Sequence, residues 1–363
     1  MTVFDRRPPL RWLVPLLAAL VLVAGGSAAG VISATARGGL PARTTAQLLV
    51  DVQKARLGGL SGTIVQNADL GLPSIPSAGG SGSSDLSSLV AGSHTLKLWY
   101  AGPDRVRLAL LGSLGESDVV RRGGDLWTWS SRTNTATHRT LPRSMGGAPR
   151  SLAGASPLTP QQAADAALQA IRPSARVTND GTAVVAGRSA YELVLTPRTH
   201  DSLVRSVRIA VDGATHVPLR VQVYGSNASK PALQVGFTSF NPTRPDSSVF
   251  RFNPPAGAKV SQQSGKPSTR LTPGARGHAA GAAPRVVGTG WTSVVVAHAP
   301  AMPSGQGSSS IAGVLRALPT VHGSWGTGHV LRGTLFSAVL TDDGRVAVGA
   351  VTPERLYSAL ARR

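Results

Sequence analysis

Apolar and polar residues alternate one by one along many short segments of this 363-residue chain. Residues 94–100, for example, place Leu96, Leu98 and Tyr100 on one side of an extended backbone. This period of two predicts strands of an antiparallel sheet with one wet face, because successive side chains point to opposite sides. The pattern predicts strands at 60–70, 94–100, 105–111, 117–121, 126–130, 135–141, 182–186, 189–196, 202–212, 217–224 and 233–240.

Helical periodicity is confined to a few segments. The apolar spacing predicts a helix over 44–57 with a threonine cap. Thr159 followed by Pro160 predicts the start of a second helix over 159–171, because proline is favoured in the first turn. A third helix is expected at 354–361, after a threonine and a proline.

The N-terminus has the order of features found in export signals. Three arginines precede an uncharged stretch, Trp12 to Ala36, and small residues follow its most apolar part, 12–24. This order is typical of a signal peptide, and it also fits an uncleaved helix whose N-terminus stays in the cytoplasm. Residues 1–36 are therefore expected to be a signal peptide or a membrane anchor. In both cases the rest of the protein is exported, either secreted or anchored to the cytoplasmic membrane.

Composition divides the remaining chain into two folded units. Residues 43–260 contain the long series of strands, and residues 261–285 are polar and rich in Gly, Pro and Arg, which predicts a flexible linker. Residues 286–363 form a smaller unit, expected to be α+β. Its strands are expected at 291–298, 333–341 and 345–351.

The chain is strongly basic, with a formal net charge of +20. This charge favours attraction to polyanions such as an anionic membrane or a cell-wall surface. The alternative is a compositional bias toward Ala, Gly and Arg without functional meaning. No dense basic run with interleaved aromatic residues occurs, so nucleic acid is not an expected partner.

Catalytic and metal-binding motifs are missing from the sequence. There is no cysteine, no H-E-x-x-H, no G-x-S-x-G and no P-loop. The closest histidines, His322 and His329, have no acidic or histidine neighbour that would complete a metal shell. The sequence therefore predicts a protein that is not an enzyme and needs neither a metal nor another cofactor.

The apolar strand faces are the candidate binding surface. A meander of antiparallel strands could close into a barrel or curl into an open one, and its apolar face must then be filled by helices or by a lipid. Pattern alone favours an ordinary core over a ligand cavity, because apolar faces usually are core. The residues expected to line a cavity, if there is one, are Leu96, Leu98, Val106, Leu108, Trp127, Trp129, Leu193, Leu195, Val221 and Phe237.

Several strand-and-turn motifs resemble the lipoprotein-carrier superfamily, which includes LolA-like carriers and RseB/MucB-like sensors. The first are residues 96–107 (LKLWYAGPDRVR) and 119–129 (VVRRGGDLWTW), which are similar to a strand, P-x-R-x-R and G-x-x-x-W-x-Y. The late F-x-F-x-P-P-x-G at 250–257 is the most telling. Further similar segments are 191–197, 207–212 and 217–221.

The resemblance implies an α+β fold: a curved, unclosed antiparallel half-barrel with helices on its concave face, followed here by the small C-terminal α+β unit. It also implies an apolar cavity that takes the acyl chains of a lipid or lipoprotein.

Three functions remain open at this point. The first is an extracytoplasmic binding protein for lipid or lipoprotein acyl chains. The second is an RseB-like regulator that binds a membrane anti-sigma partner through residues 286–363. The third is an envelope protein that binds polyanions.

Overall fold

The computed structural model describes residues 39–55, 57–72, 88–89, 91–113, 115–141, 174–263, 284–298 and 317–362. The expected export segment 1–36 and the expected helix 159–171 lie outside these residues, as does most of the expected linker. Within the described ranges, no helix has the length and apolarity needed to span a membrane.

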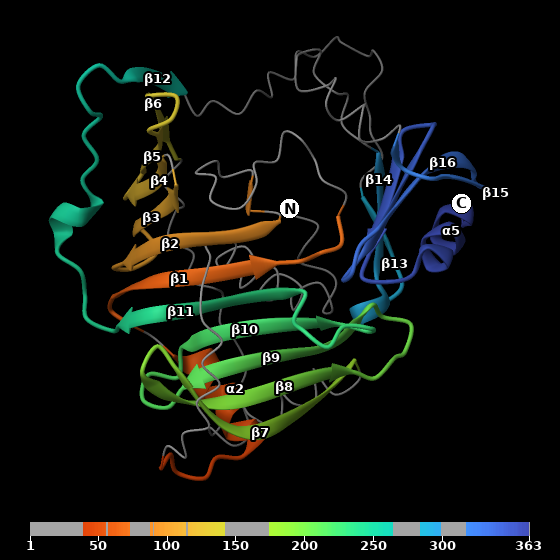
Figure 1. Ribbon diagram of the computed structural model, residues 1–363, viewed down its shortest axis with the longest axis horizontal. Coiled ribbons are helices and arrows are strands. Elements are labelled where there is room, and N and C mark those ends of the chain that lie inside the picture. The colour runs from red at the N-terminus through yellow and green to blue at the C-terminus, as the bar shows by residue number, and fades with distance from the viewer. Residues whose placement is uncertain are drawn as a thin grey trace, which may run out of the picture.

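Twelve strands form one unclosed sheet in the order β12-β6-β5-β4-β3-β2-β1-β11-β10-β9-β8-β7 (Figure 1). Neighbouring strands are antiparallel except β6 and β12, which are parallel, so the sheet is mixed rather than purely antiparallel as expected. Its strands are β1 (Leu60–Ala68), β2 (Gly92–Tyr100), β3 (Arg105–Gly112), β4 (Gly115–Arg122), β5 (Asp125–Ser130), β6 (Thr135–Thr140), β7 (Ala175–Val185), β8 (Arg188–Pro197), β9 (Val204–Asp212), β10 (Pro218–Gly225), β11 (Leu233–Asn241) and β12 (Lys259–Gln263).

Strand β7 is longer than the alternation predicts. It begins at Ala175 rather than at Thr182, and its register with β8 shifts between Asn179 and Thr182. Gly181 supplies a positive φ of 99° at this irregularity. The polar sequence around the bulge conceals the strand, because a bulge interrupts the period of two.

Helix α2 (Thr45–Lys54) packs on the β7–β9 part of the large sheet. A reciprocal capping box starts it, because the Thr44 hydroxyl accepts the Gln47 N–H and the Gln47 side chain accepts the Thr44 N–H. Leu48 is fully buried against Tyr191 and its neighbours. The helix ends at Lys54, three residues before the predicted end.

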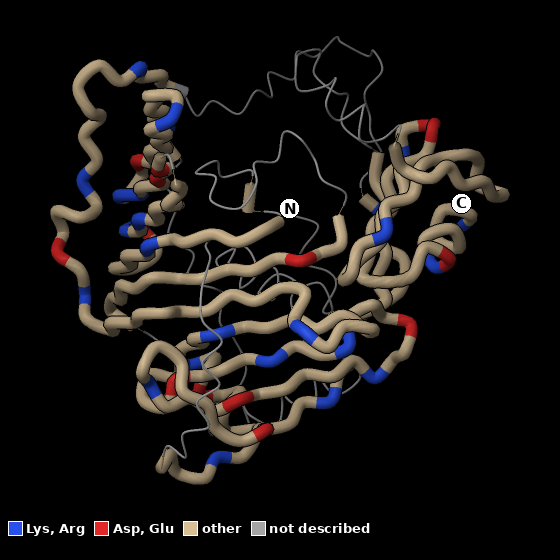
Figure 2. Tube along the Cα trace, viewed as in Figure 1, with Lys and Arg blue, Asp and Glu red and all other residues tan. Residues whose placement is uncertain are grey.

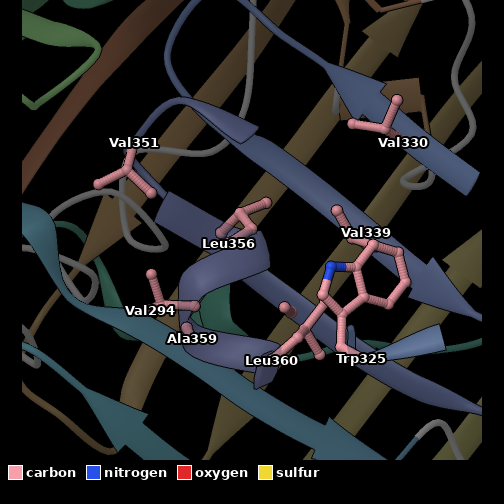
Figure 3. Close-up of a cluster of buried hydrophobic side chains, with 9 residues drawn as sticks. Val294, Trp325, Val330, Val339, Val351, Leu356, Ala359 and Leu360 are labelled. Carbon is pink, nitrogen blue, oxygen red and sulfur yellow. The ribbon is translucent and has the colours of Figure 1, made fainter. Parts of the chain in front are cut away.

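A second sheet contains six antiparallel strands in the order β13-β14-β18-β17-β16-β15. Helix α5 (Pro353–Ala361) covers one face of it, and Leu356 and Leu360 meet Val294, Val339 and Trp325 there (Figure 3). The expected strand 333–341 is shorter in the structure, since residues 333–336 form a turn after β16 and only 337–341 are a strand, β17. The strands are β13 (Arg285–Val287), β14 (Val294–His298), β15 (Thr320–Gly323), β16 (Gly326–Arg332), β17 (Ser337–Thr341) and β18 (Arg345–Gly349).

The predicted α+β class therefore needs a correction, since the protein is mostly β. In the described part of the chain only two α-helices are present, and both are short. The physical reason is that sheets supply most of the apolar faces, while α2 and α5 each cover only part of one face. The expected unclosed sheet is present, and β7 and β12 are its two ends.

A strap connects β11 to β12 across the large sheet (left side of Figure 1). This strap, residues 242–258, contains the 3₁₀ helix η3 (Ser247–Phe250), which Asp246 caps by accepting the Ser248 N–H. Phe250 is buried, and the Asn134 side chain donates to the Gly257 carbonyl at the far end. The F-x-F-x-P-P-x-G motif thus forms the part of the strap that packs on the sheet.

Candidate functional site

The pairing register assigns side chains to the two faces of the large sheet. Directly paired residues of antiparallel strands share a face, and neighbours along a strand alternate between faces. Leu98 pairs with Leu108, and Leu108 pairs with Val119, so these three share a face across β2, β3 and β4. We call this side of the sheet the apolar face. Its members also include Ile64, Leu96, Val106, Leu110, Tyr191, Leu193, Leu195, Val207, Ile209, Val221, Val223 and Val235.

The β7–β10 half of the apolar face is covered by described parts of the protein. Helix α2 packs over Tyr191, Leu193 and Val211 (Figure 1). From the C-terminal unit, Leu335 and Trp291 pack with side chains that include Leu195, Val207, Val221 and Val223. This half of the face is therefore hydrophobic core.

The β2–β4 half of the apolar face is more accessible. Leu96 and Leu110 are fully buried, whereas Leu98, Val106 and Leu108 are only half-buried. These apolar side chains stand side by side on two adjacent strands, β2 and β3. This half has the chemistry of a surface that an acyl chain could contact.

Two of the candidate residues, Trp127 and Trp129, lie on the opposite face. Trp127 pairs with Val120, and Val120 pairs with Arg107. Because Arg107 is next to Leu108 along β3, the side chains of Arg107 and its partners point to the face opposite Leu108. Phe252 of the strap lies 5.4 Å from Trp127 and 6.3 Å from Trp129, measured between ring centroids. The two tryptophans therefore anchor the strap.

Phe237 is the cross-strand partner of Ile64, but it lies beside a β-bulge in β11, where the register with β1 shifts and the alternation of faces is interrupted. Its ring is edge-on to Phe240 at 5.0 Å and packs against a cluster that includes Ala190 and Ala210. By alternation, these two alanines point away from the apolar face. Register and packing together thus place seven of the ten candidate residues on one face: Leu96, Leu98, Val106, Leu108, Leu193, Leu195 and Val221.

The opposite face carries charged networks. Glu192 joins Arg208 at 3.2 Å and Arg220 at 3.1 Å, and Figure 2 shows basic residues along β8–β10. Nearer the strap, Arg107 donates to Asp118 at 2.6 Å, and the Asp118 side chain is 2 % exposed. The pKa of Asp118 is raised to about 6, chiefly by burial and also by nearby Glu116, against the lowering effect of Arg107.

Two polar residues of the apolar face, Gln66 and His94, are not among the candidates that the sequence predicts. They are cross-strand partners, and both are buried. Gln66 stands in a strand position where alternation with Ile64 and Ala68 calls for an apolar side chain. That mismatch was the signal that could have singled it out.

The described residues contain no group of three or more His, Cys, Asp or Glu side chains able to hold a metal ion. The two buried carboxylates, Asp118 and Asp212, each face an arginine instead.

The sequence matches no protein-family model and no curated protein. Among solved structures, a chain of the Pseudomonas aeruginosa MucA/MucB complex is 16% identical, with 87% of this chain and 96% of that chain covered and a TM-score of 0.43. A LolA superfamily protein from Nitrosomonas europaea is 10% identical over 58% of this chain and 99% of its own, with a TM-score of 0.21. LprF from Mycobacterium bovis is 10% identical over 61% and 100%, with a TM-score of 0.28.

The expected likeness to LolA-like and MucB-like proteins is thus confirmed as structural similarity. Similarity at these scores concerns the arrangement of the strands, and it assigns no role to any residue of this chain.

Proposed function

We propose that this protein is a non-catalytic, extracytoplasmic binding protein that holds acyl chains of a lipid or lipoprotein against the apolar face. One observation carries the proposal: seven candidate residues, which come from four strands, share a single face of an unclosed sheet. Each methylene group that such a face removes from water contributes about 0.8 kcal/mol, so a few contacts on a long chain suffice for binding.

The position of the accessible part supports the proposal. Leu98, Val106 and Leu108 lie on β2 and β3, away from the half of the face that α2 and the C-terminal unit cover. The export pattern of residues 1–36 supports a location outside the cytoplasmic membrane, where lipid carriers and envelope regulators work.

A matched pair of variants tests the proposal. Val106→Asp introduces a charge on the apolar face, whereas Val348→Asp introduces the same charge at a solvent-exposed strand position of the six-stranded sheet. Burying a carboxylate under an acyl chain is costly, and its cross-strand neighbour Arg121 is already paired with Asp104, so Val106→Asp should reduce lipid binding by about tenfold or more. Native mass spectrometry with organic extraction, on protein purified from an exporting host, measures the bound lipid.

The proposal is supported if phospholipid or acylated peptide co-purifies at near one-to-one with the wild type and with Val348→Asp, and if Val106→Asp loses this bound lipid. Circular dichroism and thermal melting check that both variants are folded. A wild-type protein that stays empty after incubation with lipid contradicts it.

A regulatory function is the second candidate, and an exposed valine pair favours it. Val295 is 37 % exposed and Val348 is 36 % exposed, and the two are direct partners across β14 and β18. Alternation points them away from α5, because Val294 and Ala347 face the helix. Such a pair is a small docking surface for a membrane protein partner. The same variants distinguish the two functions, since loss of partner capture in Val348→Asp alone favours regulation.

A further inference from the structure

The Gln66 side chain has an unpartnered acceptor on the apolar face. Gln66 is 2 % exposed, and its Nε2 donates to the Leu89 carbonyl at 2.8 Å. That contact fixes the orientation of the amide, because the flipped group would set two oxygens against each other. Among the residues that the structure describes, the buried Oε1 atom therefore has no hydrogen-bond partner.

The nearby donors in the described part of the chain are already in use. The His94 Nε2 lies 2.9 Å from the Ala91 carbonyl, which can only accept, so this nitrogen carries the hydrogen and donates it there. Nδ1 of the same ring is then an acceptor, 3.5 Å from the Ser88 hydroxyl. The backbone N–H groups of β1 serve its ladders with β2 and β11.

A water molecule is a poor substitute at this position. A buried water needs two to four polar partners. The same-face neighbours of Gln66 along and across the strands are Ile64, Ala68, Val235 and His94, and the ring nitrogens of His94 already face the Ala91 carbonyl and the Ser88 hydroxyl. An unsatisfied buried carbonyl oxygen is costly, which makes it a strong acceptor for any donor that an apolar ligand brings with it.

We propose that Gln66 is a recognition residue whose Oε1 accepts a hydrogen bond from the hydroxyl or amide N–H that joins an acyl chain to the rest of its ligand. This inference rests on the proposed function, because it assumes that acyl chains lie on the apolar face. It adds a chemical preference: acylated ligands with a hydrogen-bond donor next to the chain bind more tightly than those with acceptors alone.

Three probes with the same acyl chain test the preference. Monolaurin offers hydroxyls, lauramide offers an amide N–H, and methyl laurate offers only acceptors. Each competes with an environment-sensitive fluorescent fatty acid for the full-length protein. The wild type should bind monolaurin, lauramide or both about five- to tenfold more tightly than methyl laurate, as expected for one net hydrogen bond. The probe that shows the preference identifies the donor.

Gln66→Met removes the acceptor while keeping an unbranched side chain of similar size. It should bind methyl laurate at least as well as the wild type and lose the preference for donor probes. The matched control is Gln222→Met, since Gln222 lies on the opposite face and its Nε2 donates to Gln234. This control should keep the preference.

The outcomes separate this inference from the proposed function. If all three probes bind the wild type equally, or if Gln66→Met keeps the preference, the role of Gln66 is wrong while acyl binding stands. If no probe binds, both are wrong. The comparison of probes on the unaltered protein does not depend on the variant folding.

Discussion

Asp118 is the buried carboxyl with the most unusual environment among the described residues. Its carboxylate meets Arg107, whose guanidinium also lies 3.9 Å from Glu116 and 5.5 Å from the centre of the Trp99 ring. Desolvation is nonetheless the dominant influence, and the pKa rises from 3.8 to about 6. The folded state therefore holds a proton on Asp118 more tightly than the unfolded chain does.

The raised pKa of Asp118 predicts that protonation of this carboxyl at lower pH stabilises the folded state. Because the folded pKa lies above the unfolded one, the contribution is fully present below about pH 4 and is lost as the pH rises through 6. The free energy of unfolding should therefore gain about 2–3 kcal/mol from this group between pH 7.5 and pH 4.5. Asp118→Asn should lose that gain, which urea denaturation at several pH values measures.

Other groups titrate over the same range, so the informative quantity is the difference between wild type and variant. Asp201→Asn is a suitable control, because Asp201 is a surface carboxylate paired with Arg355. If the free energy of unfolding changed with pH in the same way in the wild type and in Asp118→Asn, burial would not raise the pKa of Asp118.

At the scale of elements, the strap holds the β3–β6 arm of the sheet together from its charged side. Phe250 is 2 % exposed next to β3 and β4, and Phe252 lies against the two tryptophans of β5. The strap then continues into β12, which pairs in parallel with β6. The strap thus covers the face on which β3 and β4 present both polar and apolar side chains.

The packing of the strap predicts that a single aromatic side chain, Phe250, contributes strongly to the free energy of unfolding. Phe250→Ala removes a fully buried ring and leaves a cavity, so it should lower the free energy of unfolding by about 3–5 kcal/mol. Urea denaturation followed by tryptophan fluorescence measures this. Arg251→Ala is the control, since Arg251 is exposed in the same segment and should cost under about 0.5 kcal/mol. A loss of less than about 1 kcal/mol for Phe250→Ala would mean that the strap packs loosely.

The strands of the sheet could largely be predicted from the sequence, because alternation and turn residues are local. The predicted strands 105–111 and 189–196 begin and end within one residue of the ends of β3 and β8. The start of β7 could not be found, since its bulge breaks the alternation. The placement of Trp127 and Trp129 depends on the strap, which reaches them from more than a hundred residues away in sequence.

The composition of the apolar face also depends on contacts between residues that are distant in sequence. Alternation shows which residues of one strand share a side, but only the register between strands tells which sides coincide. Leu98 and Leu193 belong to one face through a chain of pairings that includes Gln66 with Val235 and Ile209 with Leu193. Pairings between strands so distant in sequence cannot be deduced from a local pattern.

At the scale of the whole molecule, the two sheets are joined by backbone hydrogen bonds. The Leu203 N–H donates to the Ala350 carbonyl at 2.9 Å, and the Thr334 N–H donates to the Leu70 carbonyl at 2.7 Å. Beside them, Leu335 is buried among side chains of the large sheet that include Val204 and Val223. The C-terminal unit therefore closes one end of the apolar face and shares a core with it.

This shared core predicts that the two units unfold together. Scanning calorimetry of the wild type should show one transition in which the calorimetric and van't Hoff enthalpies agree. Leu335→Ala should cost about 2–5 kcal/mol and separate the unfolding of the six-stranded sheet from that of the large sheet, because it removes a buried apolar contact between them. Val348→Ala, on the solvent-facing side, should leave a single transition. Two well-separated transitions already in the wild type would show that the units are stable independently, and the C-terminal unit would then be free to move away from the apolar face.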